Sequence, residues 1–198
     1  ILQIKMKKII FAIIILILDT NFIFGNEKIT KIIDGKKDAK INLIVYESLT
    51  CSHCANFHKD VYPLLKENFI DKGIINLEFR NFPLDMAALN ASKIAHCKND
   101  GDSKILHFLY NNQNEWAKGQ DLDEFNNNLK IIVENENFDL DFKKCLENTD
   151  LEDYILEDRI KAVKKYKIEA TPTLVIMGKK FNKTLTYKNI KKAIEKLI

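Results

Sequence analysis

A pair of cysteines, Cys51 and Cys54, lies between a strand pattern and a helix pattern and restricts the fold of this chain more than any other feature. Residues 41–48 (INLIVYES) are apolar and β-branched, which predicts a buried strand. Apolar residues then recur at helical spacing over residues 51–69, and residues 74–82 predict a second strong strand. The order strand, helix, strand predicts a βαβ unit with both cysteines at its first strand–helix junction.

The rest of the chain divides into a long helical part and a short end that contains strands. Residues 86–166 carry the periodicity of four or five helices and almost no strand signal. Residues 173–177 predict a strand, Gly178 opens a hairpin turn, and a paired strand is expected from Phe181 onward. An amphipathic helix is expected over residues 187–197.

Composition and charge describe an ordinary globular chain. The 198 residues are 46% hydrophobic and 30% charged, which is enough for a domain with a buried core. Acidic and basic residues are interleaved, and the formal net charge is only +3. No nucleic-acid partner is therefore expected.

Residues 1–25 are typical of a secretory signal peptide. Lys7 and Lys8 precede about ten apolar residues, and Asp19 ends this run before it reaches the roughly 20 residues of a membrane span. An uncleaved membrane anchor is the alternative. Export would place the four cysteines in an oxidising compartment, where an even number favours two disulfides.

The position of Cys51 at the start of a helix favours its thiolate, the form that attacks disulfides. Unpaired backbone N–H groups and the positive end of the helix dipole both lower the pKa of a thiol there. Cys54 lies one turn later, so a reversible disulfide is expected, with Cys51 as the attacking and Cys54 as the resolving cysteine. His53 adds a donor or a positive charge beside the thiolate, and Ser52 should loosen the turn.

Three other interpretations of this motif stay open. A zinc site needs two more ligands; His58, His96 and Cys97 are present, but no second close pair follows at zinc-finger spacing, so no metal is expected. An inert structural disulfide is disfavoured, because it would close a very small ring at a strand–helix junction. The third interpretation is that His53 is exposed and does not influence the thiolate.

The sequence resembles the DsbA-like thiol:disulfide interchange proteins. The resemblance rests on the segments YESLTCSHCANFHKDVYPLLKENFI, LEFRNFPLD and ATPTLVIMG, and it extends over residues 30–198. It implies an α/β protein with a thioredoxin fold and a helical insertion between the βαβ half and the C-terminal ββα half. The thioredoxin-like domain would comprise residues 26–85 and 167–198, and the helical insertion residues 86–166.

The resemblance also assigns site residues by position. Cys51 matches the family nucleophile, Cys54 the resolving cysteine and His53 the thiolate-stabilising histidine. Pro172 matches the family's cis-proline, so a cis Thr171-Pro172 bond is expected, although only about 5–6% of X–Pro bonds in folded proteins are cis. This turn would lay the Thr171 backbone beside Cys51 and leave an edge for a substrate strand.

Partners and location follow from the same resemblance. Substrates would be unfolded or reduced secreted proteins, and a membrane redox partner would re-oxidise the enzyme in the periplasm; no cofactor is expected. A monomer is expected, because only a few residues separate the predicted leader from the first strand. Cys97 and Cys145 would form a structural disulfide, as in some exported DsbA-like proteins, with two unpaired buried thiols as the alternative.

Three residues depart from the family pattern. Ser52 replaces the proline of the best-known oxidases, and Thr171 replaces a frequent valine before the cis-proline. Val45 replaces a buried acid six residues before the first cysteine. These departures bear on how oxidising the pair is and on its substrate range.

The nearby acid and the remaining histidines have structural interpretations. Glu47 is the nearest acid to the cysteines in sequence, and we expect a strand-edge charge there rather than a proton relay. His58, His96 and His107 are expected to be surface residues or hydrogen-bonded structural residues.

The leading hypothesis is an exported thiol:disulfide oxidoreductase that introduces disulfides into secreted proteins through Cys51 and Cys54. A disulfide isomerase or reductase on the same fold is the first alternative, and Thr171 is its best support. A non-enzymatic thioredoxin-like binding module is the second, and the intact cysteine pair argues against it.

Overall fold

A computed structural model describes residues 28–198, and the predicted leader over residues 1–25 lies outside the described residues. A five-stranded mixed sheet with strand order β1-β3-β2-β4-β5 forms the centre of the fold. β2 (Ile41–Glu47) and β3 (Ile75–Asn81) are parallel, and all other neighbouring strands are antiparallel. The remaining strands are β1 (Ile32–Asp34), β4 (Thr173–Ile176) and β5 (Lys179–Lys180).

The helical run after the cysteine pair is continuous but changes its winding. It consists of α2 (Ser52–Asn56), the π-helical η1 (Phe57–Val61), α3 (Tyr62–Leu65) and the π-helical η2 (Lys66–Ile70). Pro63 lies in the first turn of α3, where it has no N–H to donate to the preceding turn. The kink expected at this proline corresponds in the structure to the wider turn of η1 before it.

Six helices, not the four or five expected, lie between β3 and β4. They are α4 (Met86–His96), α5 (Lys104–Asn111), α6 (Gln113–Trp116), α7 (Leu122–Glu136), α8 (Phe142–Glu147) and α9 (Thr149–Tyr166). The additional helix arises because Asn112 leaves the helical conformation and separates α5 from α6. Side chains of Asp85, Asp121, Asp141 and Asn148 cap the first turns of α4, α7, α8 and α9.

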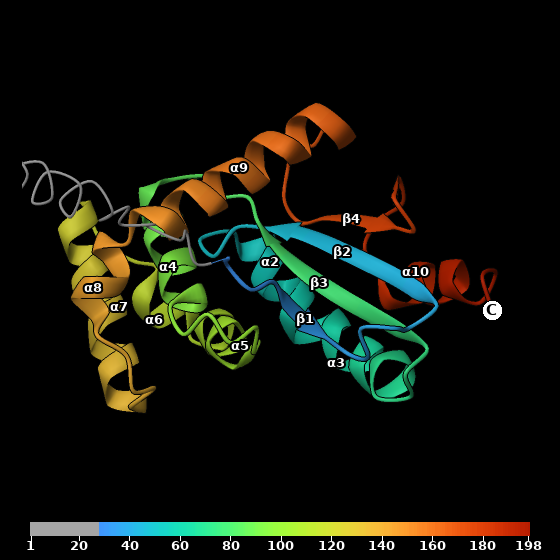
Figure 1. The fold of residues 1–198 in the computed structure, drawn as a ribbon, viewed down its shortest axis with the longest axis horizontal. Coiled ribbons are helices and arrows are strands. Elements are labelled where there is room, and N and C mark those ends of the chain that lie inside the picture. Colours follow the sequence, from blue (N-terminus) through green and yellow to red (C-terminus); the bar gives the residue numbers. More distant parts are fainter. Residues whose placement is uncertain (1–27) are drawn as a thin grey trace, which may run out of the picture.

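Helices cover both faces of the sheet (Figure 1). α2, α3 and α10 (Tyr187–Ile194) lie on one face, α9 crosses the other, and α4 to α8 gather at one end. Alternation along β2 explains this arrangement, because successive side chains point to opposite faces. Leu43 and Val45 belong to the large core under α2 and α3, whereas Ile44 and Tyr46 pack in a smaller core with Ala162 of α9.

Two predictions about the C-terminal part need correction. The hairpin partner of β4 begins at Lys179, not at Phe181, because Met177 and Gly178 form a tight two-residue turn with φ of 48° and 75°. Such a turn pairs the flanking residues directly. The last helix ends at Ile194, earlier than the expected residue 197.

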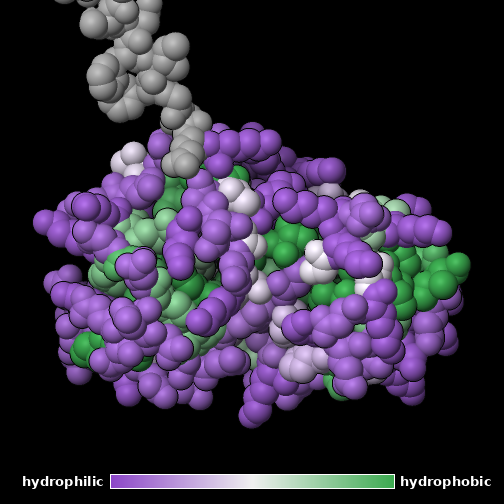
Figure 2. Space-filling model, turned by 60° about the horizontal axis from the view of Figure 1, so that its bottom comes forward, coloured by the Kyte–Doolittle hydropathy of each residue, from purple (hydrophilic) through white to green (hydrophobic). Residues whose placement is uncertain are grey.

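The surface is mainly polar. Hydrophilic residues dominate the face in Figure 2, and hydrophobic residues gather at its right-hand end, the side on which the C-terminus lies in Figure 1. No helix within residues 28–198 combines the length and apolarity that crossing a bilayer requires.

Candidate active site

The two cysteines occupy different environments at the start of α2. Cys51 is the N-cap residue, with extended backbone angles of −81° and 118°, and its side chain is partly exposed. Cys54 lies one turn later and is completely buried. Both are free thiols in this structure. Only Cys51 is therefore accessible to an approaching disulfide or thiolate.

The pKa of Cys51 is lowered to about 5. The largest cause is a hydrogen bond from the Cys54 thiol, which outweighs the opposing effect of burial. The Thr171 side chain and the backbone N–H groups of Cys54 and His53 lower the pKa further. Cys51 is consequently a thiolate at neutral pH, and its stabilisation at the helix N-terminus agrees with the sequence argument.

The pKa of Cys54 moves in the opposite direction. Burial raises it far above the usual range of a thiol, and the hydrogen bond to Cys51 and the charge of Glu47 raise it further. Cys54 is therefore a buried thiol that holds its proton. The pair combines an accessible thiolate with a protonated partner, as dithiol–disulfide exchange requires.

The segment before β4 lies directly over Cys51. The Thr171-Pro172 peptide bond is cis, and the Cys51 sulfur lies 3.4 Å from the Thr171 carbonyl oxygen. Both features agree with the expectation from the sequence. Residues from two distant segments therefore meet at the reactive sulfur.

An open groove of about 620 Å³ runs beside this junction. Its lining includes the side chains of His53, Phe57 and Asp60 on the helical run, and Thr171 and Pro172 across from them. Residues 183–187 complete the groove. The side chain of His53 is exposed in the groove, so it faces whatever binds there, while its backbone N–H acts on Cys51.

Comparison with known proteins identifies the family to which this chain belongs. The family described as Thioredoxin matches residues 27–196. The crystal structure of Wolbachia pipientis α-DsbA1 superposes with a TM-score of 0.75 and 31% sequence identity, over 84% of this chain and 90% of that chain. This chain is a DsbA-like member of the thioredoxin family. The resemblance and fold class predicted from the sequence are thereby confirmed.

Curated relatives of this DsbA-like chain carry names of the same kind. Disulfide bond formation protein D of Bacillus subtilis is 28% identical over 178 residues, which cover 82% of this chain and 74% of the relative. A Rickettsia bellii protein named as a protein-disulfide oxidoreductase is 29% identical over 168 residues, which cover 83% of this chain and 63% of the relative. This chain thus spans about three-fifths of the length of its Rickettsia relatives.

The expectation of a strand-edge charge at Glu47 is wrong. Glu47 is the last residue of β2 and only 3% exposed, on the same sheet face as Leu43 and Val45. Its Oε2 lies 2.8 Å from Nε2 of His58, which is also buried. The sequence analysis missed this contact, although the two-residue periodicity of the strand places Glu47 under the helices.

The remaining histidines, His96 and His107, are hydrogen-bonded, as expected. His96 is buried and contacts the Asn81 side chain at 2.8 Å, and burial lowers its pKa to about 4. His107 lies between His58 and Asp34. No group of three or more His, Cys, Asp and Glu side chains in the described part of the chain is arranged to hold a metal ion.

Two contacts tie the helical insertion together and to the site. Cys97, at the end of α4, and Cys145 of α8 form a disulfide. The amide of Gln113 in α6 donates to the carbonyl oxygens of Leu49 at 2.7 Å and of Cys51 at 3.2 Å. Sequence reasoning missed Gln113, because a single glutamine in a helical segment carries no signal of a long-range contact.

Proposed function

We propose that this DsbA-like protein is a thiol:disulfide oxidoreductase that introduces disulfides into secreted proteins at Cys51 and Cys54. The observation that carries the proposal is the opposite direction of the two pKa shifts, with Cys51 lowered to about 5 and Cys54 raised. Stabilising the Cys51 thiolate stabilises the reduced form of the pair. The disulfide form is therefore a strong oxidant of other thiols.

The reaction proceeds through a mixed disulfide. A substrate thiolate attacks the Cys51 sulfur, the Cys51–Cys54 bond breaks, and its electron pair leaves on Cys54, which then takes up a proton. A second substrate thiolate attacks the substrate sulfur of the mixed disulfide and releases the Cys51 thiolate. The substrate is oxidised to a disulfide, and the enzyme is left reduced.

The groove residues would hold the substrate during this exchange. Thr171 and Pro172 line the groove beside the accessible sulfur, and the backbone of this segment would pair with an extended substrate strand. His53 would add a donor or a positive charge near the thiolate when substrate closes the groove. These roles are supported by position in the groove and by the match to the family.

The wider setting is part of the proposal. A secretory leader over residues 1–25 would bring the protein to the periplasm, where reduced or unfolded secreted proteins are substrates and a membrane partner re-oxidises Cys51 and Cys54. Residues 26–85 and 167–198 would form the thioredoxin-like catalytic domain of a monomer. Residues 86–166 would form an inserted helical domain, clamped by the Cys97–Cys145 disulfide.

Oxidation of a reduced dithiol peptide tests this function. We expect oxidised wild-type protein to convert the peptide stoichiometrically, and Cys51→Ser and Cys54→Ser both to be inactive, because neither variant can form the disulfide that oxidises the peptide. A double variant, Cys97→Ser with Cys145→Ser, serves as the control that keeps the reactive pair.

Two results would contradict the proposal. A wild-type protein that reduces insulin disulfides but does not oxidise the peptide would be a reductase. A wild-type protein that neither oxidises the peptide nor reduces insulin disulfides would be a binding module, because such a module needs no exchange at Cys51.

A further inference from the structure

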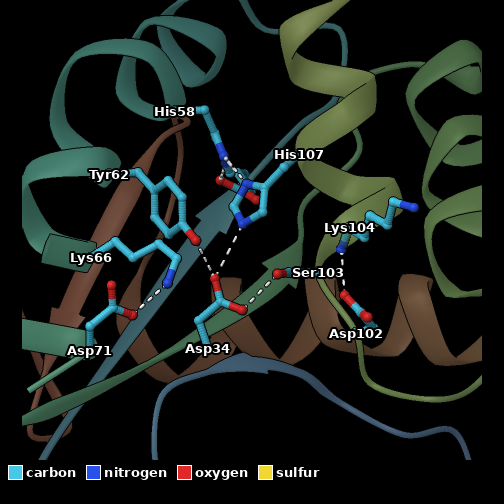
Figure 3. A network of polar contacts seen from close by, with 10 residues as sticks. Asp34, His58, Tyr62, Lys66, Asp71, Asp102, Ser103, Lys104 and His107 are labelled. Carbon is cyan, nitrogen blue, oxygen red and sulfur yellow. Dashed lines mark hydrogen bonds and ion pairs between the residues drawn. The ribbon is translucent and has the colours of Figure 1, made fainter. Parts of the chain in front are cut away.

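A continuous chain of hydrogen bonds leads from the buried Glu47 to Asp34 near the surface, and Figure 3 shows its outer part. Glu47 Oε2 lies 2.8 Å from His58 Nε2, His58 Nδ1 lies 3.0 Å from His107 Nδ1, and His107 Nε2 lies 3.2 Å from Asp34 Oδ2. Side-chain exposure is 2% for Glu47 and 1% for His58, but 19% for His107 and 16% for Asp34. The chain therefore connects a buried carboxyl group with one that water reaches.

Each of these three contacts holds one proton, which either partner can carry. Two ring nitrogens approach to 3.0 Å only when a hydrogen lies between them, so one Nδ1 donates and the other accepts. If all three protons move by one bond in the same direction, one proton is transferred in net terms between Asp34 and Glu47. Both imidazoles exchange tautomers in the process.

The outer end of the chain favours the ionised carboxylate. Burial acts to raise the pKa of Asp34, but hydrogen bonds from His107, Ser103 and Tyr62 outweigh it, and the pKa is lowered. The Tyr62 and Ser103 hydroxyls both donate to the Asp34 carboxylate at 2.6 Å, as Figure 3 shows. Asp34 is therefore ionised, and a proton that reaches it is held only briefly before it passes inward to His107 or outward to water.

The inner end of the chain is the carboxyl group of Glu47. The second carboxylate oxygen of Glu47, Oε1, is buried and has no hydrogen-bond partner within residues 28–198. The charge of Glu47 acts directly on Cys54. The Tyr110 ring stacks on His58 with centroids 3.9 Å apart, and burial raises the pKa of Tyr110, so this hydroxyl does not compete for the proton. Glu47 is thus a buried carboxyl group whose charge acts on the completely buried Cys54.

We propose that Glu47, His58, His107 and Asp34 form a proton relay between Cys54 and solvent. This inference rests on the proposed function, because Cys54 gains a proton when the Cys51–Cys54 disulfide opens and loses it when the disulfide forms again. Cys54 is completely buried, so another group must carry that proton.

When the disulfide opens, Asp34 takes a proton from water, one proton is transferred along the relay to Glu47, and Glu47 gives a proton to the Cys54 thiolate. When the disulfide forms, Glu47 takes the Cys54 proton, and Asp34 releases one to water. The four residues hold positions along the proton path and do not contact the substrate.

The relay is tested at the step in which Cys54 loses its proton. Reduced protein reacts with oxidised glutathione in two steps: Cys51 forms a mixed disulfide, and Cys54 then attacks the Cys51 sulfur and releases glutathione. Rapid quenching measures both rates between pH 5 and 9. Glu47→Gln and His107→Gln keep hydrogen bonds but cannot pass a proton, and Tyr62→Phe removes a hydrogen bond to Asp34 outside the relay.

We expect both relay variants to slow the second step at least ten-fold at pH 7 and to make its rate rise more steeply with pH. The first step in these variants, and both steps in Tyr62→Phe, should stay within two-fold of wild type. Second-step rates and pH profiles like those of wild type would overturn the relay. An effect of Glu47→Gln without one of His107→Gln would also overturn it, because the path would then end at Glu47.

Failure of the relay and failure of the proposed function give different results. The glutathione assay needs no protein substrate, so wild-type protein that resolves glutathione rapidly but does not oxidise a peptide contradicts the function alone. If the variants do not fold, the wild-type protein still supplies a test. Coupling between the two Nδ1 nuclei of His58 and His107 in ¹⁵N NMR is expected from a shared proton, and its absence would contradict the relay.

Discussion

The sulfur of Cys51 lies 3.4 Å from the carbonyl oxygen of Thr171, a residue 120 positions later in the chain. The helical run after Cys51, strand β3 and six further helices separate the two residues in sequence, yet β2 and β4 are neighbours in the sheet and bring them together. The reactive cysteine thus lies between the start of α2 and the segment before β4. In the proposed function, an incoming substrate strand would meet both.

The first prediction concerns the origin of the low Cys51 pKa. Since the hydrogen bond from Cys54 is the largest cause of the shift, Cys54→Ala should raise the Cys51 pKa from about 5 by at least about one unit, towards the ordinary value of 9.0. Thiolate absorbance during a pH titration measures it. An unchanged midpoint would mean that the helix N-terminus alone sets the pKa.

The second prediction is a pH dependence of the stability of the reduced protein. The folded pKa of Cys51, about 5, lies below the value of 9.0 for a free thiol, so its contribution to stability is complete above pH 9 and is lost as the pH falls to 5. Cys54 stays protonated in this range, so it adds no pH dependence to the stability. The melting temperature of reduced relative to oxidised protein should therefore fall between pH 8 and pH 5; a constant difference would contradict it.

The third prediction concerns Asp158 of α9, which lies 3.9 Å from Arg80 of β3. Burial raises the Asp158 pKa from 3.8 to about 6, so the folded protein binds a proton at this carboxyl group more tightly than the unfolded chain does. The free energy of unfolding therefore falls as the pH rises from 3.8 to about 6. Asp158→Asn should remove this loss and raise the free energy of unfolding at pH 7, by at most about 3 kcal/mol.

Urea unfolding of this variant at pH 4 and pH 7 provides the measurement. Asp153→Asn, which changes an exposed acid on the same helix, is the matched control and should leave the pH dependence unchanged. A large loss of stability in Asp158→Asn at pH 7 would show that the ion pair with Arg80 outweighs the cost of burial.

The fourth prediction tests the link between the helical insertion and the active site. Gln113→Leu leaves two carbonyl oxygens, those of Leu49 and Cys51, without this donor, and should lower the free energy of unfolding by about 1–3 kcal/mol in both redox states. Gln120→Leu, at an exposed position, should change it by less than about 0.5 kcal/mol. Equal effects of the two changes would rule out the link.

Local patterns in the sequence predicted the parts of the site that local structure determines. The strand over residues 41–48 and the helix after it place Cys51 at a helix N-terminus, and that position alone indicates a low pKa. Alternation along the same strand also places Glu47 on the covered face with Val45, so this part of the relay was accessible to sequence reasoning.

The non-local contacts could not be predicted in this way. His107 meets His58 because α5 packs on η1, and Asp34 joins them because β1 pairs with β3. Neither packing leaves a periodic signal in the sequence. The same holds for Gln113, whose partners lie more than sixty residues earlier.

The equilibrium of the Cys51–Cys54 pair with glutathione tests the central claim most directly. A low Cys51 pKa and a protonated, buried Cys54 stabilise the reduced form, so we expect a reduction potential towards that of the strong oxidases, about −120 mV, and above about −200 mV. A potential near that of thioredoxin, about −270 mV, would contradict the assignment as an oxidase.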